Sequence, residues 1–277
     1  ILMLLYREQK AKNKALNSLS IQNKKILAMH DVLEEQRDNL DKLNATKDKF
    51  FSIIAHDLKN PFGSISGLSE QMVENFDEFD DDMKRKVMNT IHKAAKQALD
   101  LLENLLQWAR SQTGRLNFEP KDIKLNELVK RIISLVEVQA MNKDITISTQ
   151  LDDDDEVFAD TDMLETTIRN LLSNAIKYTN PSGTIKITSN STDEKIQISV
   201  IDDGVGIAEE NLNKLFKINS KFSSDGTASE KGTGLGLILC KEYVDRHQGE
   251  IYAKSKLDKG SKFTLVLKKH GVNLHLD

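Results

Sequence analysis

Residues 50–62 read FFSIIAHDLKNPF and place a histidine on the polar side of an amphipathic helix. At about 100° per residue, the apolar side chains of this segment and of the next two turns share one broad face. They are Phe50, Phe51, Ile54, Ala55, Leu58, Phe62, Ile65 and Leu68. His56 points the opposite way, and Asn60, one turn later, lies on nearly the same side. We therefore expect the imidazole to face solvent, and we expect Pro61 to kink the helix because it removes a backbone hydrogen bond.

This helix is expected to begin near residue 9, as an imperfect two-stranded coiled coil over residues 9–47. The segment up to Phe50 has no Gly and no Pro, and its apolar residues recur with heptad spacing. One heptad position holds Leu19, Ile26, Leu33 and Leu40, and the other holds Met29, Leu43 and Phe50. Gln22, Gln36 and Lys47 interrupt these series. A weak seam could shift and carry a signal; a plain dimerising rod is the alternative.

The N-terminus begins with five apolar residues, ILMLL, followed by Tyr6 and Arg7. Five residues cannot span a bilayer, which takes about 20. An aromatic and a basic residue at the exit are typical of the cytoplasmic end of a membrane helix. We therefore expect residues 1–8 to end such a helix and the chain to be the cytoplasmic portion of a membrane receptor; a slightly apolar N-terminus is the alternative.

A second helix, about 83–112, is expected to fold back after an acidic turn at 74–82. Its apolar stripe consists of Val87, Ile91, Ala94, Ala95, Ala98, Leu101, Leu102, Leu105, Trp108 and Ala109. One helical hairpin cannot bury both stripes well, whereas two hairpins can do so as a four-helix bundle. Residues 48–115 therefore predict a homodimer, with Gly114 as a helix cap at the hinge to the next domain.

Composition excludes several other classes of protein. The 277 residues favour about two domains, and 39% hydrophobic residues are enough for a packed core. A net charge of −4, without a massed basic patch, argues against nucleic-acid binding. The single cysteine, Cys240, excludes an intrachain disulfide and any multi-cysteine metal site, and it falls in an apolar helical stretch.

From residue 116 to about 270 the pattern changes to short strands that alternate with helices. Helices are expected at 125–141, 161–178, 208–216 and 234–247, and strands at 144–150, 156–159, 184–190, 195–202, 249–256 and 261–268. The two periodicities together favour a two-layer α/β sandwich. The expected fold class is therefore α+β multidomain: a coiled coil and an antiparallel helical hairpin, then an α/β sandwich over 116–270 and a tail at 271–277.

Three polar motifs fall inside the second domain. Residues 170–178 read NLLSNAIKY, residues 202–206 read DDGVG, and residues 232–237 read GTGLGL. Singly they could be a helix face, a tight turn and a glycine-rich loop. Together with the histidine segment, and in this order, they resemble the sensor histidine kinases over residues 48–268. The second domain resembles the Bergerat-type (GHKL) ATPase fold, which those kinases share with type II topoisomerases, mismatch-repair ATPases and the ninety-kilodalton chaperone.

The resemblance implies a role for three residues of the histidine segment. His56 is the implied phosphorylated nucleophile, because a neutral imidazole has a free ring nitrogen. Asp57 would orient the other ring nitrogen or take its proton. Asn60 falls where the family holds the polar side chain that helps water to attack the phosphorylated partner, so phosphatase activity is expected too. The commoner family sequence after the histidine is Glu-Leu-Arg-Thr-Pro, from which this chain departs conservatively.

The resemblance also implies a site for ATP and Mg²⁺. Asn174 would offer its amide oxygen to Mg²⁺, with Asn170 beside it. Lys177 would act as a point charge for phosphate, and Tyr178 would pack on the nucleotide. Asp202 would accept a hydrogen bond from the adenine amino group.

The remaining implied contacts lie around the loop 217–232. Gly204 and Gly206 are expected to let the backbone approach the adenine ring. Further residues implied at the nucleotide are Phe216, Phe222, Lys231, Gly232, Thr233, Gly234, Leu235 and Gly236. The helix that follows these glycines could bind phosphate at its N-terminus. Residues 260–263 resemble the last family box or form a plain hairpin turn.

These implications together predict a dimeric kinase that phosphorylates His56 from ATP and passes the phosphoryl group to an aspartate of a response regulator. The expected partners are a second copy and that regulator, with no nucleic acid. Two other classes stay open: another ATPase of the same nucleotide-binding fold, and a non-catalytic scaffold that binds ATP.

Overall fold

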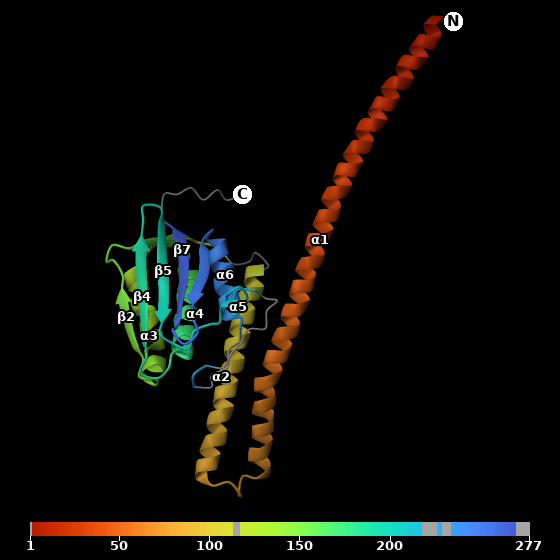
Figure 1. The fold of residues 1–277 in the computed structure, drawn as a ribbon. Helices are drawn as coiled ribbons and strands as arrows, with labels where there is room; N and C mark the ends of the chain where they lie inside the picture. The colour runs from red at the N-terminus through yellow and green to blue at the C-terminus, as the bar shows by residue number, and fades with distance from the viewer. Residues whose placement is uncertain (1, 113–116, 218–225, 229–233, 270–277) are drawn as a thin grey trace. The chain divides into compact units, whose positions relative to one another are not determined.

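The computed structural model describes residues 2–112, 117–217, 226–228 and 234–269. By its internal contacts the chain divides into two units, Ile1–Ile53 and Ile54–Asp277. The elements in chain order (Figure 1) are α1 Leu2–Glu74, α2 Asp81–Gln112, β1 Lys121–Lys124, α3 Leu125–Met141, β2 Thr146–Gln150, β3 Glu156–Ala159, α4 Thr161–Tyr178, β4 Thr184–Ser191, β5 Lys195–Asp202, α5 Glu209–Leu212, α6 Gly236–Arg246, β6 Glu250–Ser255 and β7 Ser261–Lys268.

Helix α1 carries both the predicted coiled-coil segment and the histidine segment. Residues 2–60 contain neither Gly nor Pro, and Pro61 lies inside the helix without ending it. The four heptad leucine and isoleucine residues are each more than half exposed in the single chain: Leu19, Ile26, Leu33 and Leu40. A second helix would be needed to cover them. Within the described residues, no helix combines the length and apolarity that crossing a bilayer requires.

The turn between α1 and α2 is built by acidic residues. Asp80 caps α2, since its Oδ1 accepts a hydrogen bond from the Met83 amide at 2.7 Å. Asp81 and Asp82 lie in the first turn of α2, where the helix dipole favours negative charge. Helix α2 therefore begins two residues before the expected start at 83.

The helical hairpin buries one apolar face and leaves another uncovered. The buried set includes Ile54, Met72, Val87, Ala94 and Leu101. The exposed set includes Phe62, Leu99, Leu102 and Leu106, which are between 43% and 58% exposed. An uncovered apolar face of this kind is what one half of a four-helix bundle presents.

The second domain is built on a five-stranded sheet in the order β2-β4-β5-β7-β6. β2 pairs with β4 in parallel, and the other neighbours pair antiparallel. On the central strand β5, Ile196, Ile198 and Val200 alternate toward the buried face. A separate antiparallel pair joins β1 to β3. Strand β1 was not expected, because its four residues carry a single buried side chain, Ile123.

Helices α3, α4 and α6 cover the buried face of this sheet. Their apolar stripes join the strand residues in one core, with Leu128 and Ile132 from α3, Leu171 and Leu172 from α4, and Val244 from α6. This is the two-layer α/β sandwich that the sequence predicts. Cys240 is fully buried within the same core. Helix α5 is shorter than the predicted 208–216 segment, because the residues after Leu212 form turns.

The start of α4 is fastened by a buried polar group. Asp160 caps the helix with Oδ1, and its Oδ2 accepts from the Glu119 amide at 3.0 Å. The Asp160 amide donates to His247 Nε2 at 2.9 Å, while His247 Nδ1–H donates to the Tyr243 carbonyl at 2.6 Å. Burial lowers the pKa of His247, which keeps the imidazole neutral as this accepting role requires. This hydrogen bonding fixes the N-terminal end of the helix that carries the asparagine motif.

Candidate functional site

His56 lies exposed on α1 and is oriented by its neighbour. Its side chain is 67% exposed, and its Nδ1 lies 3.0 Å from Oδ1 of Asp57. A neutral imidazole that donates its Nδ1–H to this carboxylate keeps the lone pair on Nε2. The arrangement therefore leaves an exposed nitrogen nucleophile whose tautomer and ring orientation are set by a carboxylate.

Asn60 is exposed one turn after His56, on the same stretch of helix. Its backbone carbonyl accepts from the Ser64 hydroxyl at 3.1 Å. Residues four apart on a helix are neighbours on its surface. A polar amide therefore lies beside the imidazole, where it can meet whatever approaches His56.

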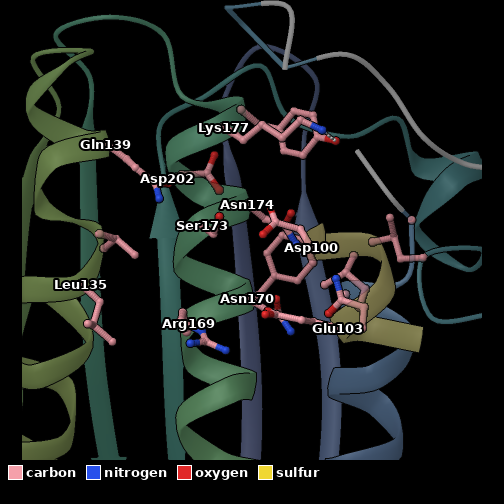
Figure 2. A pocket seen from close by; sticks show the side chains of 18 of the residues that line it. Asp100, Glu103, Leu135, Gln139, Arg169, Asn170, Ser173, Asn174, Lys177 and Asp202 are labelled. Carbon is pink, nitrogen blue, oxygen red and sulfur yellow. Dashed lines mark hydrogen bonds between the residues drawn. The ribbon is translucent and has the colours of Figure 1, made fainter. Parts of the chain in front are cut away.

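A second candidate site is a cavity of about 520 Å³ beside the C-terminal half of α4. Figure 2 shows Asn170, Asn174 and Lys177 along this helix with Asp202 of β5 nearby. The sequence-predicted residues that line it are Asn170, Asn174, Lys177, Tyr178, Asp202, Gly234 and Gly236. The structure thus brings together members of all three motifs of the second domain. A cavity of this volume is large enough for a small-molecule ligand.

Asp202 is the buried acid of this cavity. It is 6% exposed, and its Oδ1 accepts from the amides of Gly204 at 3.0 Å and Ser261 at 3.1 Å. Burial raises the pKa of Asp202 to about 6, and the two amide hydrogen bonds oppose that rise. Within the described residues Oδ2 has no hydrogen-bond partner. One oxygen is therefore held by the fold, and the other can accept from a ligand.

The polar side chains of α4 that line the cavity lie about one turn apart along the helix. Asn170 and Asn174 are half-buried, and the Asn170 amide nitrogen is buried with only the weakly accepting Cys240 thiol beside it. A buried donor with only a weak acceptor is destabilising, and an acceptor on a bound ligand would offset part of that cost. Lys177 Nζ donates to the Tyr178 hydroxyl at 3.0 Å and lies 4.7 Å from the centre of its ring.

The glycines of the second motif fit protein backbone. A Cβ at Gly204 would lie 2.2 Å from the Tyr178 carbonyl oxygen, and one at Gly206 would lie 2.1 Å from the Lys256 carbonyl oxygen. Gly206 also has φ +70°. From the sequence, these glycines are expected to make room for the adenine ring. In the structure their small size lets the backbone at Tyr178 and at Lys256 pack against the loop after Asp202.

Several predicted residues do not line the cavity. Phe216 is half-buried and packs against the core, while its neighbour Leu215 lines the cavity instead. Leu235 is buried just before α6. The predicted contacts that lie outside the described residues are Phe222, Lys231, Gly232 and Thr233.

The cavity also contains residues that the motifs did not single out. Ser261 and Phe263 come from β7, Ser173 and Arg169 come from α4, and α2 contributes a polar edge that includes Asp100. For residues 260–263 the sequence leaves open a plain hairpin turn; in the structure the Ser261 amide donates to Asp202 Oδ1. The register of β7 against β5, in which Ser261 pairs with Asp202, explains why two residues so far apart in sequence meet.

The possible metal ligands that line the cavity suit a magnesium ion better than a metal that prefers histidine or cysteine. No cluster of three or more His, Cys, Asp or Glu residues that could hold a metal was found within the described ranges. Asn170 and Asn174 line the cavity, and an asparagine side chain carries an amide oxygen that can bind magnesium. Magnesium usually keeps few protein ligands and completes its shell with water and substrate phosphates. The asparagine pair therefore fits such an ion if a phosphate ligand is present.

Two protein families match the sequence in adjacent regions. Residues 46–114 match the His Kinase A (phospho-acceptor) domain, and residues 159–271 match the histidine kinase-, DNA gyrase B-, and HSP90-like ATPase family. The first match contains His56, and the second contains the three motifs of the cavity.

Individual relatives point the same way. The chain is 29% identical to the adaptive-response sensory kinase SasA of Gloeothece citriformis, over 85% of this chain and 61% of the relative. It is 30% identical to the sensor-like histidine kinase SenX3 of Mycolicibacterium smegmatis, over 82% and 58%. The chain covers between 28% and 63% of the length of the first five curated relatives.

Among solved structures, the chain is similar to the histidine kinase ThkA in its complex with the response regulator protein TrrA. That similarity has a TM-score of 0.68 at 26% identity, over 85% of this chain and 65% of the other.

Gly260 tests whether the turn before β7 must pack closely against the backbone of Asp202. It has φ +83°, and a Cβ there would lie 1.9 Å from the Asp202 carbonyl oxygen. Gly260→Ala should therefore lower the free energy of unfolding by about 1–3 kcal/mol, as measured by urea denaturation. Lys259→Ala, at the exposed neighbouring position of the same turn, is the control and should change little. Equal stability of Gly260→Ala and the parent would show that the close approach at Gly260 is not required.

Proposed function

Because the chain belongs to the sensor histidine kinase family, we propose that it transfers the γ-phosphoryl group of ATP to His56 and then to an aspartate of a response regulator. The observation that carries this proposal is the exposed imidazole of His56 with its Nδ1 bonded to Asp57. The second requirement is a nucleotide site, which the cavity beside α4 could provide. It has a buried carboxylate, Asp202, for adenine and two asparagine side chains for the phosphate end.

The proposed first step forms a nitrogen–phosphorus bond. The Nε2 lone pair of His56 attacks the γ-phosphorus, and the bond to the bridging oxygen breaks, so that ADP leaves with that electron pair. The ring gains positive charge as the bond forms. Asp57 stabilises this charge through the Nδ1–H hydrogen bond and can accept that proton.

In the proposed nucleotide site, Asp202 Oδ2 accepts from the adenine amino group while the Gly204 and Ser261 amides hold Oδ1 in place. Asn174 offers its amide oxygen to Mg²⁺, with Asn170 beside it, and Lys177 and Tyr178 lie at the end of the same helix. When bound, Mg²⁺ would neutralise charge on the phosphates. Gly234 and Gly236 also line the cavity and would lie at the phosphate end of ATP.

A homodimer accounts for the exposed apolar side chains of the hairpin and of the heptad segment. Phe62, Leu99, Leu102 and Leu106 are the kind of surface that a second hairpin would bury. In the proposed organisation, residues 9–47 form a signalling coiled coil, residues 48–115 dimerise and carry His56, and residues 116–270 bind ATP. Residues 1–8 would continue from a membrane helix of a receptor.

The response regulator is proposed as the phosphate acceptor and also as a substrate for dephosphorylation. The phospho-imidazole on the exposed face of α1 is open to a protein partner, since His56 is 67% exposed. Asn60 lies on the same face, so its amide could orient a water for attack on the phosphorylated aspartate. Kinase and phosphatase activities would then share one surface.

His56→Gln should abolish labelling of the chain by γ-labelled ATP with Mg²⁺, because it removes the attacking nitrogen. Asp57→Asn should slow labelling by about 100-fold or more, since it removes the carboxylate that orients the ring. The parent product should be labile in acid and stable in base, and His92→Gln, exposed on α2, should label like the parent. ATP hydrolysis without label would favour another ATPase of this fold, and ADP binding with neither activity would favour a scaffold.

The proposed contact between Asp202 and adenine should make nucleotide affinity depend on pH. Its pKa of about 6 means that the carboxyl becomes protonated as pH falls through that value, and it then no longer accepts from the adenine amino group. Affinity for Mg·ADP, measured by calorimetry, should therefore fall from about pH 7.5 to about pH 5.5. Asp202→Asn should bind about 10- to 100-fold more weakly at the higher pH and lose much of this dependence.

The comparison between parent and variant cancels the titration of the nucleotide itself. Parallel pH profiles for the parent and Asp202→Asn would contradict the role of the carboxylate.

Asn60→Ala should separate the two activities. Phosphorylation of His56 should stay within about threefold of the parent, while dephosphorylation of the phosphorylated regulator should slow by about tenfold or more, because the water loses its orienting amide. Lys59→Ala, one residue away and exposed, is the control. If Asn60→Ala leaves the dephosphorylation rate unchanged, the phosphatase role of this residue is wrong.

A further inference from the structure

The last turn of α4 is held by donors that come from outside the helix. The final carbonyls of a helix have no partners within it. Here the Thr179 amide donates to the Ala175 carbonyl at 2.9 Å, and the Val205 amide donates to the Tyr178 carbonyl at 3.1 Å. Val205 belongs to the loop that follows Asp202, so the end of α4 is bonded to the loop beside the buried acid.

Lys143 supplies the donors for the two carbonyls in between. Its Nζ lies 2.9 Å from the Ile176 carbonyl oxygen, 3.0 Å from the Lys177 carbonyl oxygen and 2.6 Å from Thr227 Oγ1. A lysine ammonium has three N–H donors, so it can donate to all three of these acceptors. A positive charge at this end of a helix is also favourable to the helix dipole.

Thr227 connects the same helix end to a segment of the long loop. Its amide donates to the Lys177 carbonyl at 3.0 Å, and its hydroxyl oxygen lies 2.7 Å from the Thr179 carbonyl oxygen. The hydroxyl can donate to that carbonyl while it accepts from Lys143. Both Lys143 and Thr227 are half-buried, so these bonds are partly shielded from water.

We propose that Lys143 and Thr227 are positioning residues for nucleotide binding, and that they act by fixing the last turn of α4. Both lie outside the four sequence motifs and do not line the cavity, whereas Asn174, Lys177 and Tyr178 do line it. Fixing the carbonyls of residues 176 and 177 fixes the backbone from which the Lys177 and Tyr178 side chains extend. The proposal rests on the ATP-binding role given above.

The bonds of Thr227 add a second consequence. One residue of the 226–228 segment is bonded to both Lys177 and Thr179, and through Lys143 to Ile176. The wall of the cavity on α4 and the chain segment 226–228 are therefore tied at one point. Breaking this tie should loosen the phosphate end of the site, while the hydrogen bonds of the Asp202 carboxylate stay intact.

The test compares Mg·ADP affinity and ATP kinetics in the full chain. Lys143→Met and Thr227→Val should each raise the dissociation constant of Mg·ADP and the KM for ATP by about tenfold, with kcat for His56 labelling within about threefold of the parent. Thr227→Ser keeps the hydroxyl and should restore the parent affinity. Lys186→Met, at an exposed position on β4, is the matched control.

A double variant tests whether the two residues act together. Because Lys143 donates directly to Thr227, the loss of affinity in Lys143→Met combined with Thr227→Val should be smaller than the sum of the two single losses. Melting temperature is measured in parallel, and Thr227→Val decides the matter if Lys143→Met does not fold.

Parent-like affinity in folded single variants, even with a lowered melting temperature, would show a purely structural role and overturn the proposal. Additive losses in the double variant would also overturn it. A parent chain that does not bind Mg·ADP would instead refute the ATP-binding role itself, so the two failures are distinguishable.

Discussion

The need to satisfy the carbonyls at the end of α4 governs how the cavity is put together. The carbonyl oxygens of residues 175–178 have no hydrogen-bond donor within the helix, and leaving them unpaired in a buried place would cost free energy. Their donors come from Thr179, from Val205 after β5, from Lys143 after α3, and from Thr227. One local requirement thus joins three separate chain segments around the helix that carries Asn170, Asn174 and Lys177.

The two candidate sites have opposite environments, and each suits its proposed chemistry. Asp202 is buried and its Oδ1 is held by two amides, which fixes the remaining oxygen for recognition of one group in one direction. His56 is exposed on a helix surface, where both a nucleotide and a partner protein can approach it. A nucleophile that must meet two different reactants cannot be buried, whereas a specificity contact gains strength from burial.

Much of this fold could be predicted from the sequence. The bounds of α3, α4, β3, β5 and β7 agree with expectation because their apolar periodicity is strong and their ends carry turn residues. Strand β1 escaped prediction because four residues with one buried side chain have no readable period. The exposure of His56 could be predicted from the helical wheel. Its hydrogen bond to Asp57 could be anticipated because the two residues are adjacent in the sequence.

The supporting residues of the cavity could not be predicted in the same way. Lys143 and Thr227 are 84 positions apart and meet only because α3, α4 and the 226–228 segment pack together. Ser261 reaches Asp202 across 59 positions through the pairing of β5 with β7. Periodicity reports which face of an element is buried, but not which distant backbone atom a side chain will meet.

The most direct test of the central claim is to identify which ring nitrogen of His56 carries the phosphoryl group. The chain would be incubated with ATP and Mg²⁺ and examined under denaturing, alkaline conditions by phosphorus NMR, whose chemical shifts distinguish the two phosphohistidine isomers. Phosphate is expected on Nε2 of His56, because Nδ1 is hydrogen-bonded to Asp57. Phosphate on Nδ1, or on a residue other than His56, would contradict it.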